Sequence, residues 1–216
     1  MSDLSYTQEF LLCILKPQGT IPTFYSTQIS TCLVAGGILE LLNLNVISIN
    51  DKKKIVVNNG TTLEKEYLRP LYQVICNSKK KDVKDIVSRY IFGTGKLLNE
   101  YIKSLSIPMV KENLISLETG GVFKTKTLYI PNEESVLRVV EKIRAEFLEG
   151  GPVSNETIIL GALLYKSSAI KRYFSQYESD ILKNRLNEVK KSKEGSFIKE
   201  MVDYIEALIS VIGFIG

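Results

Sequence analysis

The sequence has no histidine and no tryptophan among its 216 residues. Without imidazole, the Ser-His and Cys-His nucleophile pairs are excluded, and so is any zinc site that uses a histidine ligand. A phosphate-binding loop is missing too, because the nearest segment, Phe92 to Lys96, has too few residues between its glycines and no hydroxyl residue after the lysine. We therefore expect a protein that binds rather than catalyses, with no catalytic residue, cofactor or metal.

Long apolar runs and cysteines are also scarce. The longest runs, Ile159 to Tyr165 and Ala207 to Gly216, are far shorter than the ~20 residues that cross a bilayer. The N-terminal residues lack the basic and apolar regions of a signal peptide. Cys13, Cys32 and Cys76 are odd in number, far apart and in apolar surroundings, which is typical of reduced core thiols in a cytosolic protein. We expect a cytoplasmic protein that associates with membranes peripherally.

What the chain does contain is enough apolar material for one substantial core. Apolar residues make up 44% of it, and we expect a single domain spanning residues 1–216. The 28 basic and 24 acidic residues leave a net charge of +4, which allows negatively charged partners but falls short of the dense positive field of a dedicated nucleic-acid binder.

Local signals predict a mainly helical structure. Ser5 and Gln8 have the spacing of a capping box, which predicts a helix over Tyr6 to Ile14. A second helix follows Pro22, and Gly36-Gly37 within it indicates that a neighbouring helix packs closely there. Further helices are expected at Leu63–Cys76, at Asp82–Phe92, at Lys96–Leu105, from Pro108, from Asn132 to Gly150, and at Ile158–Ala169, Ile170–Lys191 and Phe197–Ile212.

Two segments have the alternation and turn residues of β-hairpins. The first pairs Val46–Ile49 with Ile55–Val57, and the second pairs Leu114–Leu117 with Phe123–Tyr129 around a turn at Glu118–Gly121. A helix followed by a hairpin thus occurs twice. The predicted fold class is mainly α, a helical bundle decorated with two β-hairpins.

Lysines gather in three clusters at predicted turns or helix ends: Lys52–Lys54, Lys79–Lys81 and Lys190–Lys193. Each cluster by itself can be a solvated turn. Two clusters on one face would attract an anionic surface, since each lysine near anionic lipid contributes about 1 kcal/mol.

The tip of the second hairpin has the composition of a membrane anchor. Val122 and Phe123 follow its glycines directly, and Lys124 and Lys126 come next. A ring beside lysines can enter the headgroup region while the lysines meet phosphate. The alternative is that Phe123 folds back into the core.

Several segments resemble the Golgi phosphoprotein 3 family over nearly the whole chain. They are Thr7–Leu12, Phe24–Leu42 with the hairpin after it, Leu63–Leu71, Met109–Ile115 leading into the second hairpin, Ile130-Pro131 and Arg138–Arg144. The resemblance implies a helical bundle with hairpins, no enzyme activity, and binding of phosphatidylinositol 4-phosphate on a flat basic face. In eukaryotic members the second hairpin dips into the bilayer, and the proteins retain glycosyltransferases by binding their cytosolic tails. Because it has no histidine and no tryptophan, the chain resembles a divergent prokaryotic member of the family.

The resemblance also implies a lipid pocket. In place of the family's tryptophan stands Tyr25, and in place of its arginines stand Val34, Asn99 and Ile102. Valine cannot replace the forked donors that arginine offers to phosphate, but Lys96 and Lys103 lie within one turn of the substituted positions. The predicted lipid-binding residues are Tyr25, Lys96, Lys103, Lys124 and Lys126, and the predicted membrane-insertion tip is Val122 with Phe123.

The leading hypothesis is a non-enzymatic peripheral membrane adaptor that binds anionic lipid. The tails of client proteins and further copies of the same chain, in a homo-oligomer, are additional expected partners. One alternative is a winged-helix-like nucleic-acid binder, with Lys52–Lys54 on a wing, although the helix ending at Leu44 carries no Arg or Lys. Another is an oligomeric protein-interaction module that uses the apolar run Ala207–Phe214.

Overall fold

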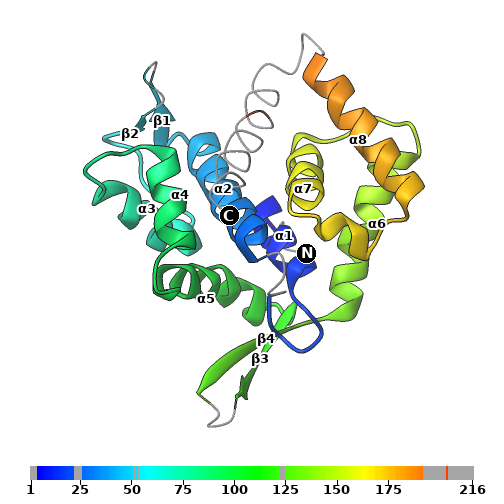
Figure 1. The fold of residues 1–216 in the computed structure, drawn as a ribbon, viewed down its shortest axis with the longest axis horizontal. Coiled ribbons are helices and arrows are strands. Elements are labelled where there is room, and N and C mark those ends of the chain that lie inside the picture. The colour runs from blue at the N-terminus through cyan, green and yellow to red at the C-terminus, as the bar shows by residue number, and fades with distance from the viewer. Residues whose placement is uncertain are drawn as a thin grey trace.

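A computed structural model of the chain describes residues 4–21, 26–50, 52, 54–121, 125–191 and 203. This part of the chain folds into eight α-helices and two separate two-stranded antiparallel sheets (Figure 1), which confirms the predicted fold class. The helices are α1 (Tyr6–Ile14), α2 (Ser26–Asn43), α3 (Arg69–Cys76), α4 (Val83–Ile91), α5 (Lys96–Lys111), α6 (Glu133–Leu148), α7 (Asn155–Lys166) and α8 (Gln176–Lys191), with 3₁₀ turns η2 (Glu66–Leu68) and η3 (Ala169–Arg172). The strands are β1 (Ile47–Ile49), β2 (Ile55–Val57), β3 (Ile115–Gly120) and β4 (Lys126–Pro131).

The first helix lies at the centre of the bundle (Figure 1). All of its residues are buried, because α2, α5, α6 and α7 contact it from different sides. Its predicted capping box is present: Ser5 Oγ accepts from the Gln8 backbone N–H at 3.3 Å, and Gln8 Oε1 accepts from the Ser5 N–H at 3.2 Å. The prediction of this helix and of its start is confirmed.

The two glycines of α2 lie where other helices approach most closely. A Cβ atom at Gly37 would lie 2.0 Å from Tyr101 Oη on α5 and 2.7 Å from Leu71 Cδ2 on α3. A Cβ atom at Gly36 would lie 2.8 Å from Thr7 Oγ1 on α1. The close packing predicted from this glycine pair is therefore confirmed.

The predicted break at Pro108 is wrong, since α5 continues through this residue to Lys111. Proline has no N–H to donate and removes one helical hydrogen bond. Leu105 and Met109, on either side of Pro108, are both completely buried, so tertiary packing keeps the two halves of the helix in line.

Several predicted helix starts are also wrong. The helix expected from Leu63 begins at Arg69, after η2, and the one expected from Ile170 begins at Gln176. Ser168, in the left-handed conformation at φ 61°, separates α7 from the 3₁₀ turn η3. Ser154 caps α7, which begins three residues before the predicted Ile158. The predicted helix Phe197–Ile212 lies outside the described residues.

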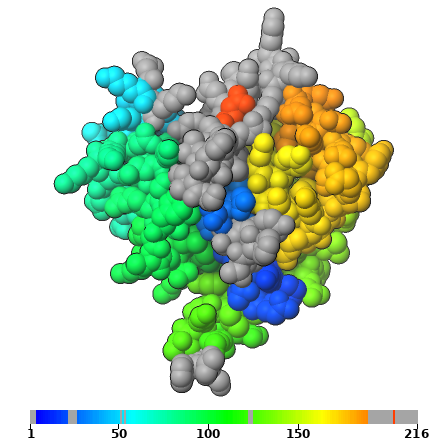
Figure 2. Space-filling model, in the orientation of Figure 1, coloured from blue at the N-terminus to red at the C-terminus, as the bar shows by residue number. Residues whose placement is uncertain are grey.

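The second hairpin projects from the bundle (Figures 1 and 2). Its strands pair from Ile115↔Pro131 to Gly120↔Lys126, so Glu118 belongs to β3 and not to the turn as predicted. The ladder continues past Glu118 because each residue up to Gly120 has a partner on β4. On the other edge of β4, the Tyr129 N–H donates to the carbonyl of Gly19 at 3.0 Å, which attaches the loop after α1 to the hairpin. The first hairpin has the predicted strands.

The cysteines divide into two kinds. Cys13 and Cys32 are buried, and burial raises the pKa of the Cys13 thiol to about 12 and raises the pKa of Cys32 as well. Cys76 is exposed near the end of α3, so the prediction of three core thiols is wrong at this position. The α3 helix buries Leu71 and Ile75, and Cys76 follows them on a different face.

Candidate functional site

Three predicted lipid-binding lysines meet in one surface hollow. The hollow has a volume of about 720 Å³ and lies between the N-terminal half of α5 and strand β4. Lys96 and Lys103 come from the helix, and Lys126 comes from the strand. The other predicted site residues, Tyr25, Lys124, Val122 and Phe123, lie outside the described residues.

Local structure explains why the two helical lysines share a face. Lys96 and Lys103 are about two helical turns apart, which places both on the same side of α5. The other side of the helix is anchored by Tyr101, which is completely buried. Gly95 precedes the helix at φ 79°, in the left-handed region that glycine adopts without strain, and so directs the chain into the first turn at Lys96.

The hollow has an excess of positive charge. Lys96 Nζ lies 3.9 Å from Glu100 Oε1, but the two side chains are 80% and 52% exposed, so the pair contributes less than about 1 kcal/mol. Neither Lys103 nor Lys126 forms an ion pair within the described part of the chain. The first turn of α5 has no acidic residue and no side-chain cap, so its positive helix end adds to the potential. An anion can therefore compete for these lysines.

Neutral polar groups complete the lining. They are Thr94, Asn99, Thr125, Thr127 and Tyr129. Burial raises the pKa of the half-buried Tyr129, so its hydroxyl stays protonated and can donate a hydrogen bond. Lysines beside hydroxyl and amide groups suit a ligand that carries both phosphate and sugar-like hydroxyls.

The three positions aligned with family arginines lie in different environments. Asn99 lines the hollow, whereas Val34 and Ile102 are buried in the hydrophobic core. An arginine at either core position would need a paired partner, so apolar residues fit the observed packing. The positive charge of the hollow comes instead from Lys96, from Lys103, which is next to Ile102 on α5, and from Lys126.

Sequence reasoning missed most of the neutral lining of the hollow. Thr125, directly before β4, and Thr127, within it, are neighbours of the predicted Lys126 in the sequence, and this proximity was the one local signal available. Thr94 and Tyr129 enter the site only because β4 packs beside α5. Their contribution depends on tertiary contacts.

The arrangement of α2 argues against the winged-helix alternative. A recognition helix must expose one face to the DNA groove. Ile29 to Leu41 of α2 are buried almost without interruption, so this helix has no such face. The run Ala207–Phe214, proposed as an oligomer interface, lies outside the described residues.

Comparison with known proteins gives one family. The family model described as Golgi phosphoprotein 3 (GPP34) matches residues 7–207, a range that contains both hairpins and the whole lysine-lined hollow. No curated protein matches the chain. Among the helices that the structure describes, none is sufficiently long and apolar to cross a membrane.

Proposed function

The chain belongs to the Golgi phosphoprotein 3 family, and from this premise we propose that it is a non-enzymatic peripheral membrane adaptor that binds anionic lipid headgroups. The observation that carries the proposal is the convergence of Lys96, Lys103 and Lys126 in one hollow. Each lysine near anionic lipid contributes about 1 kcal/mol, so three contribute about 3 kcal/mol, or roughly a hundredfold in affinity.

The favoured headgroup is that of phosphatidylinositol 4-phosphate. Its phosphate needs cations, which the three lysines provide, and its inositol hydroxyls need neutral donors and acceptors. Asn99 and the threonine hydroxyls of the hollow offer both. A headgroup without hydroxyls would leave these polar groups to water, so selectivity over a simple anionic lipid rests on them.

The second hairpin is proposed to hold the protein on the bilayer. Val122 and Phe123 connect β3 to β4 along the chain, and β4 supplies Lys126 to the hollow. The hairpin projects away from the bundle (Figure 2). Insertion of the apolar tip would therefore bring the hollow close to the headgroups.

Liposome cosedimentation tests the proposal. Wild-type protein is compared on vesicles of phosphatidylcholine alone, with phosphatidylserine, or with phosphatidylinositol 4-phosphate, the two anionic mixtures matched in charge, over a salt series. The test variant is Lys96→Gln/Lys103→Gln/Lys126→Gln. The control is Lys111→Gln/Lys171→Gln/Lys183→Gln, which removes the same charge from exposed positions outside the hollow.

We expect the test variant to lose at least about tenfold in affinity for phosphatidylinositol 4-phosphate vesicles. The control should lose much less. An equal loss in both variants would mean that net charge alone matters and would refute the hollow as the site. No binding of wild-type protein to either anionic mixture would refute the lipid function.

A further inference from the structure

A second and larger cavity lies elsewhere in the molecule. It has a volume of about 1030 Å³ and shares no lining residue with the lysine-lined hollow. It forms where the start of α1, the end of α2, η2 and α6 meet. Its size is comparable to that of many small-molecule sites.

Two buried oxygen atoms of this cavity have no hydrogen-bond partner. Glu40 is only 6% exposed, and its Oε2 accepts from Tyr67 Oη at 2.7 Å. Its Oε1 has no hydrogen bond of standard geometry, although the hydroxyls of Thr7 and Ser5 lie close enough to lower the pKa of the carboxyl. Tyr6 is 5% exposed, and its hydroxyl is also unpaired. An unpaired buried polar atom destabilises the fold unless a ligand or another group satisfies it. Tyr6 and Glu40 both line the cavity, so two unsatisfied polar groups lie beside one space large enough for a ligand.

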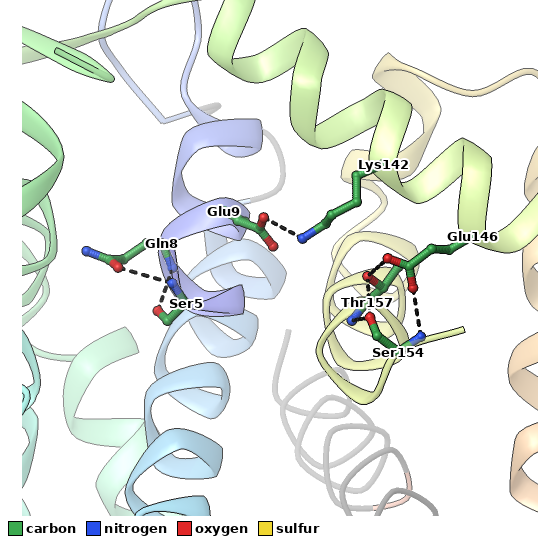
Figure 3. A network of polar contacts seen from close by, with 7 residues as sticks. All are labelled: Ser5, Gln8, Glu9, Lys142, Glu146, Ser154 and Thr157. Atoms are coloured by element: carbon green, nitrogen blue, oxygen red, sulfur yellow. Dashed lines mark hydrogen bonds and ion pairs between the residues drawn. The ribbon is translucent and has the colours of Figure 1, made fainter. Parts of the chain in front are cut away.

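Three cationic residues, Lys65, Arg138 and Lys142, line the cavity, but none of them neutralises Glu40 directly. Lys142 of α6 pairs with Glu9 of α1 across the space between these helices (Figure 3). Arg138 donates to Ser135 Oγ at 3.2 Å. No cationic side chain within the described residues forms an ion pair with Glu40. Burial raises the pKa of Glu40, and the hydroxyls of Thr7 and Tyr67 offset this only in part.

We propose that this cavity binds an organic cation, an ammonium or guanidinium group, with Glu40 Oε1 and Tyr6 Oη as acceptors. Such a group brings several N–H donors and the positive charge that the buried carboxylate lacks. The rings of Tyr6 and Tyr67 add an aromatic surface that favours cations. The site is separate from the lipid-binding hollow and does not depend on it.

The chemistry of the cavity favours an organic cation over a metal ion. Calcium takes six to eight oxygen ligands, most of them from carboxylates and carbonyls. The described residues contain no group of three acidic, cysteine or histidine side chains that could hold a metal. Glu40 instead accepts from the hydroxyl of Tyr67, and Tyr6 lines the same cavity, so the oxygens available suit N–H donors.

Binding of small probes tests the proposal. The probes are n-butylammonium and n-butylguanidinium, with neutral n-butanol and anionic butyrate as references, titrated into the full chain and followed by saturation-transfer NMR. The variants are Glu40→Gln and Tyr6→Phe, and the control is Glu149→Gln, which removes an exposed carboxylate outside the cavity. Tyr6→Phe keeps the ring and removes only an unpaired hydroxyl, so it retains the fold even if Glu40→Gln does not.

We expect the cationic probes alone to bind wild-type protein. Glu40→Gln should weaken them at least about tenfold and Tyr6→Phe about threefold or more, while Glu149→Gln leaves them unchanged. Equal binding of butanol or butyrate, unchanged binding in both cavity variants, or no cation binding to wild-type protein would overturn the proposal.

A second arm identifies the source of the cation. Blocked tripeptides Gly-Lys-Gly and Gly-Arg-Gly are compared with Gly-Gln-Gly in the same assay. Binding of the basic peptides, lost in Tyr6→Phe, assigns the cavity to a side chain of a peptide; binding of the free cations alone assigns it to a small amine. Lys96→Gln/Lys103→Gln/Lys126→Gln should bind the cations as wild type does, which separates this inference from lipid binding.

Discussion

The lysine-lined hollow and the Glu40 cavity are opposites in charge and in burial. Lys96 and Glu100 of the hollow are largely exposed and weakly paired, while Glu40 is buried at the end of α2 with one oxygen unpaired. Because the exposed lysines remain in contact with water, they destabilise the fold little. Their attraction to an anionic membrane surface grows with their number and is screened by salt. A buried charge is costly, so it favours one ligand that fits. The comparison teaches that one chain can carry exposed lysines around one cavity and a buried carboxylate beside another.

The largest expected effect is on the free energy of unfolding, and it tests how tightly the core is packed around Gly37 of α2. Gly37→Ala would place a methyl group against the buried Tyr101, and overpacking of about 3 kcal/mol outweighs the ~1 kcal/mol that alanine gains in helix propensity. We expect the free energy of unfolding to fall by about 2 kcal/mol in urea denaturation. Gly95→Ala, beside the hollow, meets no atom within 4 Å and should cost only the left-handed strain of about 1 kcal/mol. If Gly95→Ala lowered the free energy of unfolding more than Gly37→Ala, the contrast between a tightly packed core and an open hollow would be wrong.

The next effect concerns lipid binding by the tip of the second hairpin. Phe123→Ser combined with Lys124→Gln and Lys126→Gln removes the apolar tip and two charges. We expect liposome binding to fall at least about tenfold, because the interfacial anchor and about 2 kcal/mol of lysine attraction are lost. The circular dichroism spectrum and the unfolding midpoint should stay as in wild type. Unchanged binding would remove the hairpin from the lipid site.

The buried carboxylate should appear as a pH dependence of stability. Burial raises the pKa of Glu40 above its value in the unfolded chain, so the folded state holds the proton more tightly. The stabilisation is complete below the unfolded pKa, near 4.5, and is lost as the pH rises through the folded pKa. We expect the unfolding free energy of wild type to fall relative to Glu40→Gln as the pH is raised from about 4.5. A constant or opposite difference in urea titrations would show that Glu40 is not destabilised by its burial.

The smallest effect concerns the weak ion pair of the hollow. Glu100→Gln releases Lys96 from its neighbour and removes one negative charge. We expect affinity for phosphatidylserine vesicles to rise about twofold, as an exposed pair of this kind is worth less than about 1 kcal/mol. A decrease would show that Glu100 contributes to binding rather than competing with it. The gain should disappear in high salt.

Much of the fold could be predicted from local signals. The capping box at Ser5, the helix start at Asn132 and both hairpins lie where the sequence indicated. The errors occurred where packing overrode a local signal, as at Pro108, or where strand pairing extended beyond a predicted turn, as at Glu118. Neither could be found locally, because the residues that decide them lie elsewhere in the chain.

The sites were less predictable than the fold. Lys96, Lys103 and Lys126 were predicted individually, but no local pattern placed the strand lysine beside the helical ones. Glu40 gave no signal at all, since a glutamate near the end of an apolar helix is ordinary in a sequence. Its importance arises from Tyr67, which lies 27 residues away in the chain and donates to it.

The sequence by itself determined that this protein lacks imidazole chemistry, that it is mainly helical, and where most helices and both hairpins occur. These properties depend on composition and on hydrogen bonds between residues a few positions apart. Only the tertiary structure decided which charges share a surface and which are buried, because those outcomes depend on packing between distant segments. The hollow between α5 and β4 and the carboxylate beneath Tyr67 are both products of such packing.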